Sequence, residues 1–135
     1  MPDETGMEIA TLVVPDPPEA AIGQLTQVTR AIVRIYKEQF GRGPTHAFSQ
    51  YAGEDVIICV LEGTLTPVER SLVLMDELKE LQNIRQLFQA ATEATFRAAV
   101  QDITGRKVTS FMSGNDVKND LASEIFVLER EPRRT

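Results

Sequence analysis

One short pattern occurs twice in this chain of 135 residues, and the repeat constrains the fold more than any other feature. Each copy opens with Gly-Arg, passes a phenylalanine and closes with Val-Leu-Glu. The copies span residues 41–62, with Phe48, and residues 105–129, with Phe111. Before each Gly-Arg pair, apolar residues recur mostly every three or four positions, which is typical of an amphipathic helix. A helix followed by a two-stranded hairpin, used twice, predicts an αββαββ domain with approximate two-fold symmetry.

Capping signals mark the starts of two predicted helices. Asp16, followed by two prolines, can satisfy the free amides of a first turn, and this helix is expected to run to about Phe40. Thr66 and Glu69 have the spacing of a capping box, in which each side chain binds the backbone amide of the other residue. The short helix that they start is expected to turn three apolar side chains inward: Val68, Leu72 and Met75.

A longer helix is predicted from about Asp76 to Ile103, and Gly105 supplies a left-handed cap at its end. The chain can break between the two helices near residues 76–79. The long helix has an apolar stripe that consists of Leu81, Ile84, Phe88, Ala91, Phe96, Val100 and Ile103. Arg85 borders this stripe, and we expect it to pair with a glutamate of the same chain.

Four segments have the pattern of strands: residues 46–51, 56–61, 107–112 and 122–130. The second is apolar on both faces, which predicts a central strand. Its lone Cys59 is expected to be a small buried hydrophobe rather than a reactive thiol. The segment at residues 113–120 contains oxygen ligands but lacks the spacing and the terminal glutamate of a calcium loop, so we expect a solvated hairpin loop.

Together these elements predict an α+β fold. We expect a two-layer sandwich in which helices cover one face of a four-stranded, largely antiparallel sheet. The apolar side chains of the strands, among them Phe48 and Phe111, cannot all point at the helices. Because a second apolar face favours association, we expect a homodimer.

The predicted domain covers residues 16–130. An arm at residues 1–15 precedes it, and a polar tail at residues 131–135 follows it. The arm contains one apolar run, Ile9 to Val14, which fits either a short edge strand or a docking arm.

The charge of the chain argues against a nucleic-acid partner. The formal net charge is -6, and no run of Lys and Arg occurs before Arg133, whereas phosphate binding requires a basic surface. No segment approaches the ~20 apolar residues that cross a bilayer, so we do not expect direct membrane insertion. A secretory signal pattern is also missing at the N-terminus, and the expected location is the cytoplasm.

A set of short motifs in a fixed order resembles one family. The motifs are Gly41-Arg42-Gly43-Pro44, Leu61-Glu62-Gly63 with Leu65-Thr66 and Glu69, Arg85, Thr104-Gly105-Arg106-Lys107-Val108 with Phe111-Met112-Ser113, and Phe126-Val127-Leu128. They are similar to the MpsC-like family, a small prokaryotic family named after a proposed sodium-translocating, membrane-potential-generating system. The resemblance covers about residues 18–129. It implies an accessory to a membrane system linked to ion or inorganic-carbon transport, and the family supplies no established catalytic residues to carry over to this chain.

Arg42 and Arg106 occupy matching positions just after the two longer helices. Cations there can bind the last carbonyl groups of a helix and complement its dipole, which is a structural role. Alternatively, the two-fold symmetry brings both guanidinium groups, with His46 and Lys107, around a small anion such as bicarbonate, phosphate or a carboxylate. The sequence leaves both interpretations open.

Catalytic signatures are missing from the sequence. The chain has one histidine and one cysteine, and no triad, zinc or phosphate-loop pattern occurs. Glu69 has a capping role, which leaves Glu62 without a partner for acid–base chemistry. A small hydrolase or isomerase would need a perturbed His46 or a carboxylate in a cleft. We therefore expect no enzyme, no cofactor and no metal site, and favour a non-catalytic accessory module with a protein partner, with a small-anion sensor as the alternative.

Overall fold

The computed structural model describes residues 19–130 of the chain, and side chains from residue 21 onward. Its elements, in chain order, are α2 (Glu19–Phe40), β1 (His46–Tyr51), β2 (Val56–Glu62), α3 (Pro67–Leu74), α4 (Leu78–Thr104), β3 (Val108–Asp116) and β4 (Leu121–Leu128). The predictions for the Asp16 cap, for the arm at residues 1–15 and for the tail at residues 131–135 lie outside the described residues.

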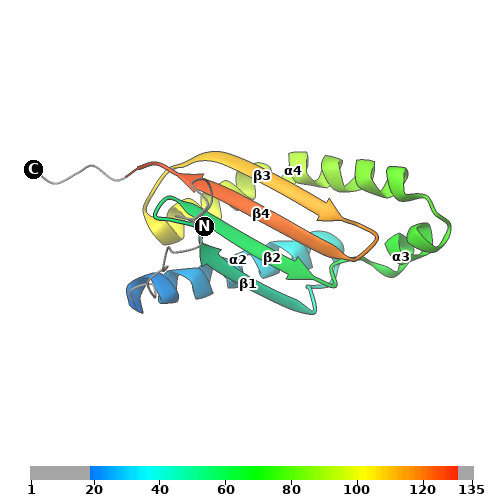
Figure 1. Ribbon diagram of the computed structural model, residues 1–135, viewed down its shortest axis with the longest axis horizontal. Helices are drawn as coiled ribbons and strands as arrows, with labels where there is room; N and C mark the ends of the chain where they lie inside the picture. The colour runs from blue at the N-terminus through cyan, green and yellow to red at the C-terminus, as the bar shows by residue number, and fades with distance from the viewer. Residues whose placement is uncertain (1–18, 131–135) are drawn as a thin grey trace, which may run out of the picture.

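The four strands form one antiparallel sheet in the order β1-β2-β4-β3. Figure 1 views the sheet from the side opposite α2 and α4, which lie together behind it. The predicted α+β fold, with helices on one face of an antiparallel sheet, is confirmed.

The register between the two central strands fits a two-fold repeat. Matching Val-Leu-Glu at residues 60–62 to the same letters at 127–129 makes Ile57 the counterpart of Glu124, and Cys59 the counterpart of Phe126. In the sheet, Ile57 pairs with Phe126 and Cys59 pairs with Glu124. A two-fold axis between β2 and β4 requires this pairing, because it exchanges the two pairs.

The two phenylalanines of the repeat are not equivalent, and this part of the prediction is wrong. Phe48 pairs with Val60, whose counterpart Val127 pairs with Ser110 rather than with Phe111. A register shift between Val108 and Ser110 adds one residue to β3. As a result, Phe111 points toward the helices, whereas Phe48 points away from them.

The core lies between the helices and the inner face of the sheet. Its fully buried apolar residues come from two helices and two strands: Val28, Ile32, Ile57, Leu61, Phe96, Val100 and Phe126. Burial of each side chain of this size contributes about 1.5–3 kcal/mol to stability. Cys59 is also fully buried among them, which confirms its predicted place.

Helix α3 begins at the predicted capping box but turns a different side inward. The Thr66 hydroxyl accepts a hydrogen bond from the Glu69 amide, and the Glu69 carboxylate accepts one from the Thr66 amide. Glu69 is buried, whereas Val68 is 71% exposed and Met75 is 66% exposed. The prediction that Val68 and Met75 point into the protein is wrong. An ion pair between Glu69 and Arg85 turns the Glu69 side of the helix toward α4 instead.

Helix α4 is separate from α3, since the chain breaks at Asp76, which has a φ of 59°. Two polar residues, Arg85 and Thr92, occupy buried positions of its inner stripe. Ile84 and Ala91, which were expected to point inward, are exposed. The buried side of α4 is therefore the side that carries Arg85 and contacts the core, and the large apolar side chain of Ile84 lies outside it.

The second hairpin is longer and tighter than expected. Residues 113–116, predicted as loop, belong to β3, and the turn is confined to residues 117–120. The Asp120 carboxylate accepts hydrogen bonds from the backbone amides of Thr64, at 2.7 Å, and Leu65, at 3.1 Å. These bonds tie the turn to the segment before α3. Strand β4 ends at Leu128, two residues earlier than predicted.

Candidate functional site

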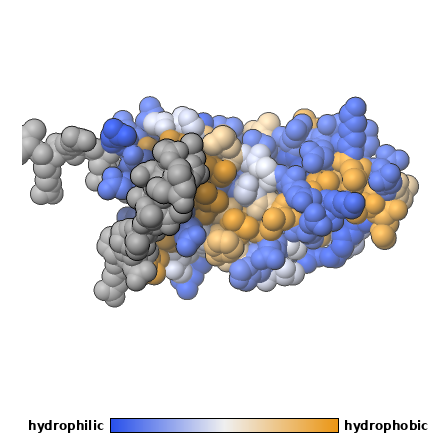
Figure 2. Space-filling model, in the orientation of Figure 1, coloured by the Kyte–Doolittle hydropathy of each residue, from blue (hydrophilic) through white to orange (hydrophobic). Residues whose placement is uncertain are grey.

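The most extensive candidate surface is the side of the sheet that faces away from the described helices, which we call the outer face. The register places its side chains in three rows: Phe48, Val60, Ser123 and Gly114; Gln50, Ile58, Ile125 and Met112; and Val56, Val127 and Ser110. Phe48 is 43% exposed and Met112 is 53% exposed. In Figure 2, which has the same orientation, hydrophobic side chains gather over the middle of the molecule. Exposed apolar surface of this kind commonly marks an interaction site.

A shallow hollow lies on the outer face beside the β3–β4 hairpin. Its volume is about 360 Å³, and its lining includes Val60, Gly114, Leu121 and Ser123. The hollow arises because the side chains of the first row become smaller from one edge of the sheet to the other, from Phe48 on β1 to Gly114 on β3. An apolar side chain from another segment could fill it.

His46 lies at one end of the outer face, where β1 begins. Its Nδ1 atom is 2.9 Å from Oε2 of Glu62, the residue opposite it on β2. Both side chains are more than half exposed, at 62% and 51%. The expectation that Glu62 has no partner is wrong, because cross-strand pairing places the two side chains side by side.

Arg42 lies near this same end of the sheet. It is half-buried, and its Nη1 atom donates a hydrogen bond to the carbonyl of Leu65 at 3.4 Å. The contact links the end of α2 to the segment before α3, which is a structural role.

Arg106 lies at the opposite end of the sheet, where it holds several chain segments together. It donates hydrogen bonds to the backbone carbonyls of Glu54 and Glu129. It also forms an ion pair with Asp55, in which the nitrogen–oxygen distance is 2.5 Å. Asp55 precedes β2, whereas the Arg42 end of the sheet lies beyond the last residue of β2, about 20 Å away along the strand. A single small anion cannot contact both guanidinium groups, and the exposed Lys107 lies at the Arg106 end.

A buried ion pair joins α3 to α4. The Arg85 guanidinium donates two hydrogen bonds of 2.7 Å to the Glu69 carboxylate and a third, of 3.1 Å, to the carbonyl of Thr64. The guanidinium also lies 4.2 Å from the ring centre of Phe40, a cation–π contact. The predicted pairing of Arg85 with a glutamate is confirmed.

A second buried polar pair lies deeper, between α2 and the sheet. The Tyr36 hydroxyl donates a hydrogen bond to Oε2 of Glu124 on β4. Burial raises the pKa of the Glu124 carboxyl to about 7, although hydrogen bonds from Ser113 and Tyr36 and the charge of Arg85 oppose this effect. Burial, with the Glu124 charge as a smaller cause, also raises the pKa of Tyr36 above its usual range. The cluster is enclosed in the core rather than open to a substrate.

Sequence reasoning missed the Tyr36–Glu124 pair, although one signal was present. Glu124 alternates with Ala122, Phe126 and Leu128, all of which point into the core. A charged residue in such a series is a candidate for a buried partnered group.

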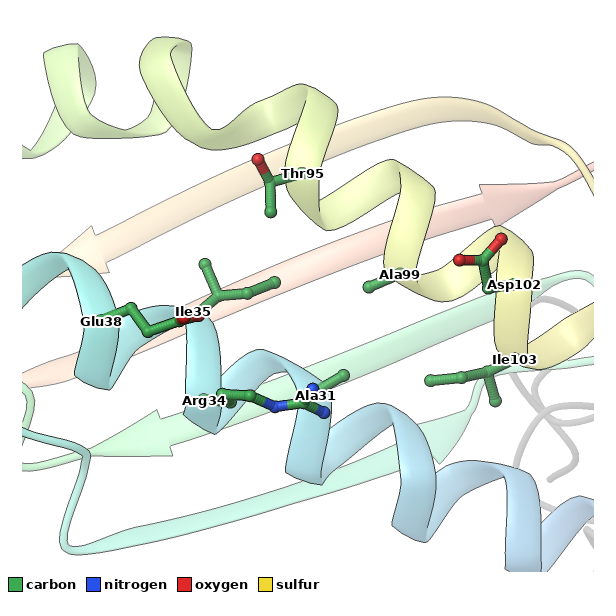
Figure 3. Close-up of a pocket in the computed structure, with 8 residues that line it drawn as sticks. All are labelled: Ala31, Arg34, Ile35, Glu38, Thr95, Ala99, Asp102 and Ile103. Carbon is green, nitrogen blue, oxygen red and sulfur yellow. The ribbon is translucent and has the colours of Figure 1, made fainter.

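A shallow groove of about 340 Å³ separates α2 and α4 on the helical side of the molecule. Figure 3 shows its side chains coming from the two facing helices. Ala31, Ile35, Ala99 and Ile103 supply apolar lining, and charged groups come from Arg34, Glu38 and Asp102. Among residues 19–130, no group of three or more His, Cys, Asp or Glu side chains is placed to hold a metal ion.

The family model described as "Na+-translocating membrane potential-generating system (MpsC)" matches residues 23–130, which include both copies of the repeat. The chain belongs to the MpsC family. The match starts within α2 and ends two residues after β4, so the MpsC family region contains the whole sheet. Searches of curated proteins and of solved structures gave no match. Within the described part of the chain, the helices are too short or too polar to cross a membrane.

Proposed function

We propose that this member of the MpsC family is a non-catalytic accessory module that works by binding other proteins. The observation that supports this proposal most strongly is the outer face, where Phe48, Ile58, Ile125 and Met112 form apolar surface on a sheet. The family description links the chain to a sodium-translocating, membrane-potential-generating system. The partner that we propose is therefore a subunit of a membrane system for ion or inorganic-carbon transport, which this module meets from the cytoplasm.

The placement of the perturbed groups supports a non-catalytic role. Glu124 and Tyr36 are both 1% exposed. Burial also raises the pKa of the Cys59 thiol to about 11, so the thiol stays protonated and unreactive at neutral pH. Catalytic groups with shifted pKa values usually line a cleft, whereas these three lie in the core.

We also propose that the chain forms a homodimer through the outer face. Four strands about 4.8 Å apart and about seven residues long present roughly 450 Å² in projection. Stable complexes commonly bury ~800 Å² on each partner, so this area favours a reversible dimer over an obligate one. A reversible dimer can exchange its second copy for another partner.

Sedimentation at several protein concentrations tests the dimer. Ile125→Lys places a charge in the middle of the outer face and is expected to keep the protein monomeric, because a charge would be buried without a partner. Ala98→Lys, on the exposed side of α4, is the matched control and should dimerise like the wild type. Equal dimerisation of the wild type and Ile125→Lys would refute the outer face as the interface.

A pull-down from solubilised membranes of the native host tests the partner. The wild-type chain and Ala98→Lys should retain a transport subunit that mass spectrometry identifies, and Ile125→Lys should lose it. Retention of the same subunit by Ile125→Lys would show that the partner binds elsewhere.

A further inference from the structure

The outer face matches an apolar run of this same chain that lies outside the described residues. We propose that residues 9–14, Ile-Ala-Thr-Leu-Val-Val, dock on the outer face of their own chain and compete with a second copy for it. This inference rests on the proposed use of the outer face for dimerisation. It assigns that face a first occupant and makes the arm a regulator of association.

The position of α2 puts the run within reach. Near the start of α2, Gln24 accepts a hydrogen bond from the Tyr51 hydroxyl at 3.1 Å, and Thr29 donates one to Ser49 at 2.6 Å. The helix therefore enters beside β1, which is an edge strand of the sheet. The five steps from Val14 to Glu19 can span about 17 Å. The sheet lies about 10 Å from the layer of α2, and a segment packed on the outer face lies about 20 Å from that layer, so these steps carry Val14 past the β1 edge and the earlier residues of the run onto the outer face. The chain can thus pass around the β1 edge to the outer face.

The length of the run also matches the sheet. Four strands spaced by about 4.8 Å measure about 14 Å from β1 to β3, and six extended residues can span about 20 Å. Residues 9–14 are therefore long enough to cross the row that contains Ile58, Ile125 and Met112.

The chemistry of the two surfaces agrees. The run contains no charged residue, and neither do the three rows of the outer face. Its nearest charged neighbours, Glu8 and Asp16, are acidic and are disfavoured near Glu62 and Asp116, which lie at one end of the sheet. The rows through Ile58 and Val56 are farther from these carboxylates. We therefore place the run over these two rows.

Removal of the arm provides the first test. If the arm occupies the outer face for nine-tenths of the time, one-tenth of the molecules are free to dimerise. Both copies must be free at once, so deletion of residues 1–15 should lower the dimer Kd about a hundred-fold. Leu12→Asp in the full chain should act in the same direction without shortening the protein. An unchanged or raised Kd in both variants would overturn the proposal.

A disulfide test reports the contact itself. Thr11→Cys combined with Ile125→Cys, in the row of Ile58, should form a disulfide within one chain under mild oxidation, because the native Cys59 is fully buried and cannot compete. Thr11→Cys with Ala98→Cys, on the exposed side of α4, is the control and should stay reduced. Disulfides only between two chains, or none, would overturn docking of the arm on its own sheet.

The two proposals fail in different ways. If the intrachain disulfide forms while Ile125→Lys leaves the dimer intact, the arm docks as proposed but the outer face is not the dimer interface. If Ile125→Lys abolishes the dimer while arm deletion changes nothing and the disulfide does not form, the interface stands and the docking of the arm is refuted.

Discussion

Tyr36 and Glu124 meet in the middle of the core, where a helix phenol donates a hydrogen bond to a carboxyl on a central strand. The two residues are 88 positions apart in the sequence, and the backbone of each belongs to a different layer of the fold. A buried carboxyl holds its proton more tightly than an exposed one, because burial disfavours the charged form. The stability of the fold therefore depends on pH through this pair.

We predict that Glu124 makes the protein less stable as the pH rises from about 4.5 to about 7. The pKa of this carboxyl is 4.5 without the fold and about 7 within it. Between these values the unfolded chain releases the proton while the folded protein keeps it, so a higher pH favours unfolding. Below 4.5 and above 7 the contribution is constant, and the total loss is about 3 kcal/mol.

Urea unfolding between pH 5 and pH 8 measures this effect. Glu124→Gln keeps the shape of the side chain without its titration, so it should flatten the pH dependence and be more stable than the wild type at pH 8. Glu80→Gln, at an exposed position of α4, should keep the wild-type slope. Identical slopes for Glu124→Gln and the wild type would contradict the prediction.

The sequence predicted the elements well because their signals are local. The Thr66–Glu69 capping box, the glycine after each long helix and the apolar run of β2 each determine the backbone within a few residues. The partner of Glu124 could not be predicted in this way. It depends on which face of β4 meets α2, and that is decided by contacts between residues far apart in the chain.

Loss of Arg85 is predicted to destabilise the fold by about 3–5 kcal/mol, because Arg85→Met leaves the Glu69 carboxylate buried without its cation. Arg97→Met provides the control. Arg97 pairs with Glu93 at 2.8 Å on α4 and donates a hydrogen bond to the Val108 carbonyl at 2.9 Å, but both side chains of the pair are about one-third exposed. Its removal should therefore cost less, about 1–2 kcal/mol. Chemical denaturation of both variants at one pH makes the comparison.

The buried pair should also show strong coupling. Glu69→Gln added to Arg85→Met removes the unpaired charge, so the double variant should be less destabilised than the sum of the two single variants. Additive losses would show that Arg85 acts through packing, for example on the Phe40 ring, rather than through its charge.

Gly63→Ala is predicted to be more destabilising than Gly105→Ala. Both glycines have a φ of 70°, which costs any other residue about 1 kcal/mol or more. At Gly63 an added Cβ would also lie 2.3 Å from the Thr45 hydroxyl oxygen, whereas at Gly105 it would meet no atom within 4 Å. Thermal unfolding should place the Gly63→Ala transition several degrees below that of Gly105→Ala. Equal transitions would mean that Thr45 moves aside at little cost.

The repeat illustrates a second limit of sequence reasoning. The short motifs that recur in the repeat correctly predicted two helix–hairpin units, yet Phe48 and Phe111 point to opposite sides of the sheet. One extra residue in a strand reverses the direction of the side chains that follow, and nothing in the sequence near Val108 marks the irregularity. The outer face therefore has one phenylalanine where perfect symmetry would give two.

The separation of Arg42 and Arg106 leads to a prediction about small anions. A ligand at a hundredfold excess over its Kd would stabilise the folded protein by about 2.7 kcal/mol, which thermal unfolding detects readily. Because the two guanidinium groups lie at opposite ends of the sheet, we expect no selective stabilisation by bicarbonate, phosphate, sulfate or acetate at matched ionic strength. Arg106→Ala should lower the transition temperature equally with and without each anion, since Arg106 binds the Glu129 carbonyl and Asp55. A selective shift that vanishes in Arg42→Ala would instead establish an anion site at the His46 end of the sheet, formed without Arg106.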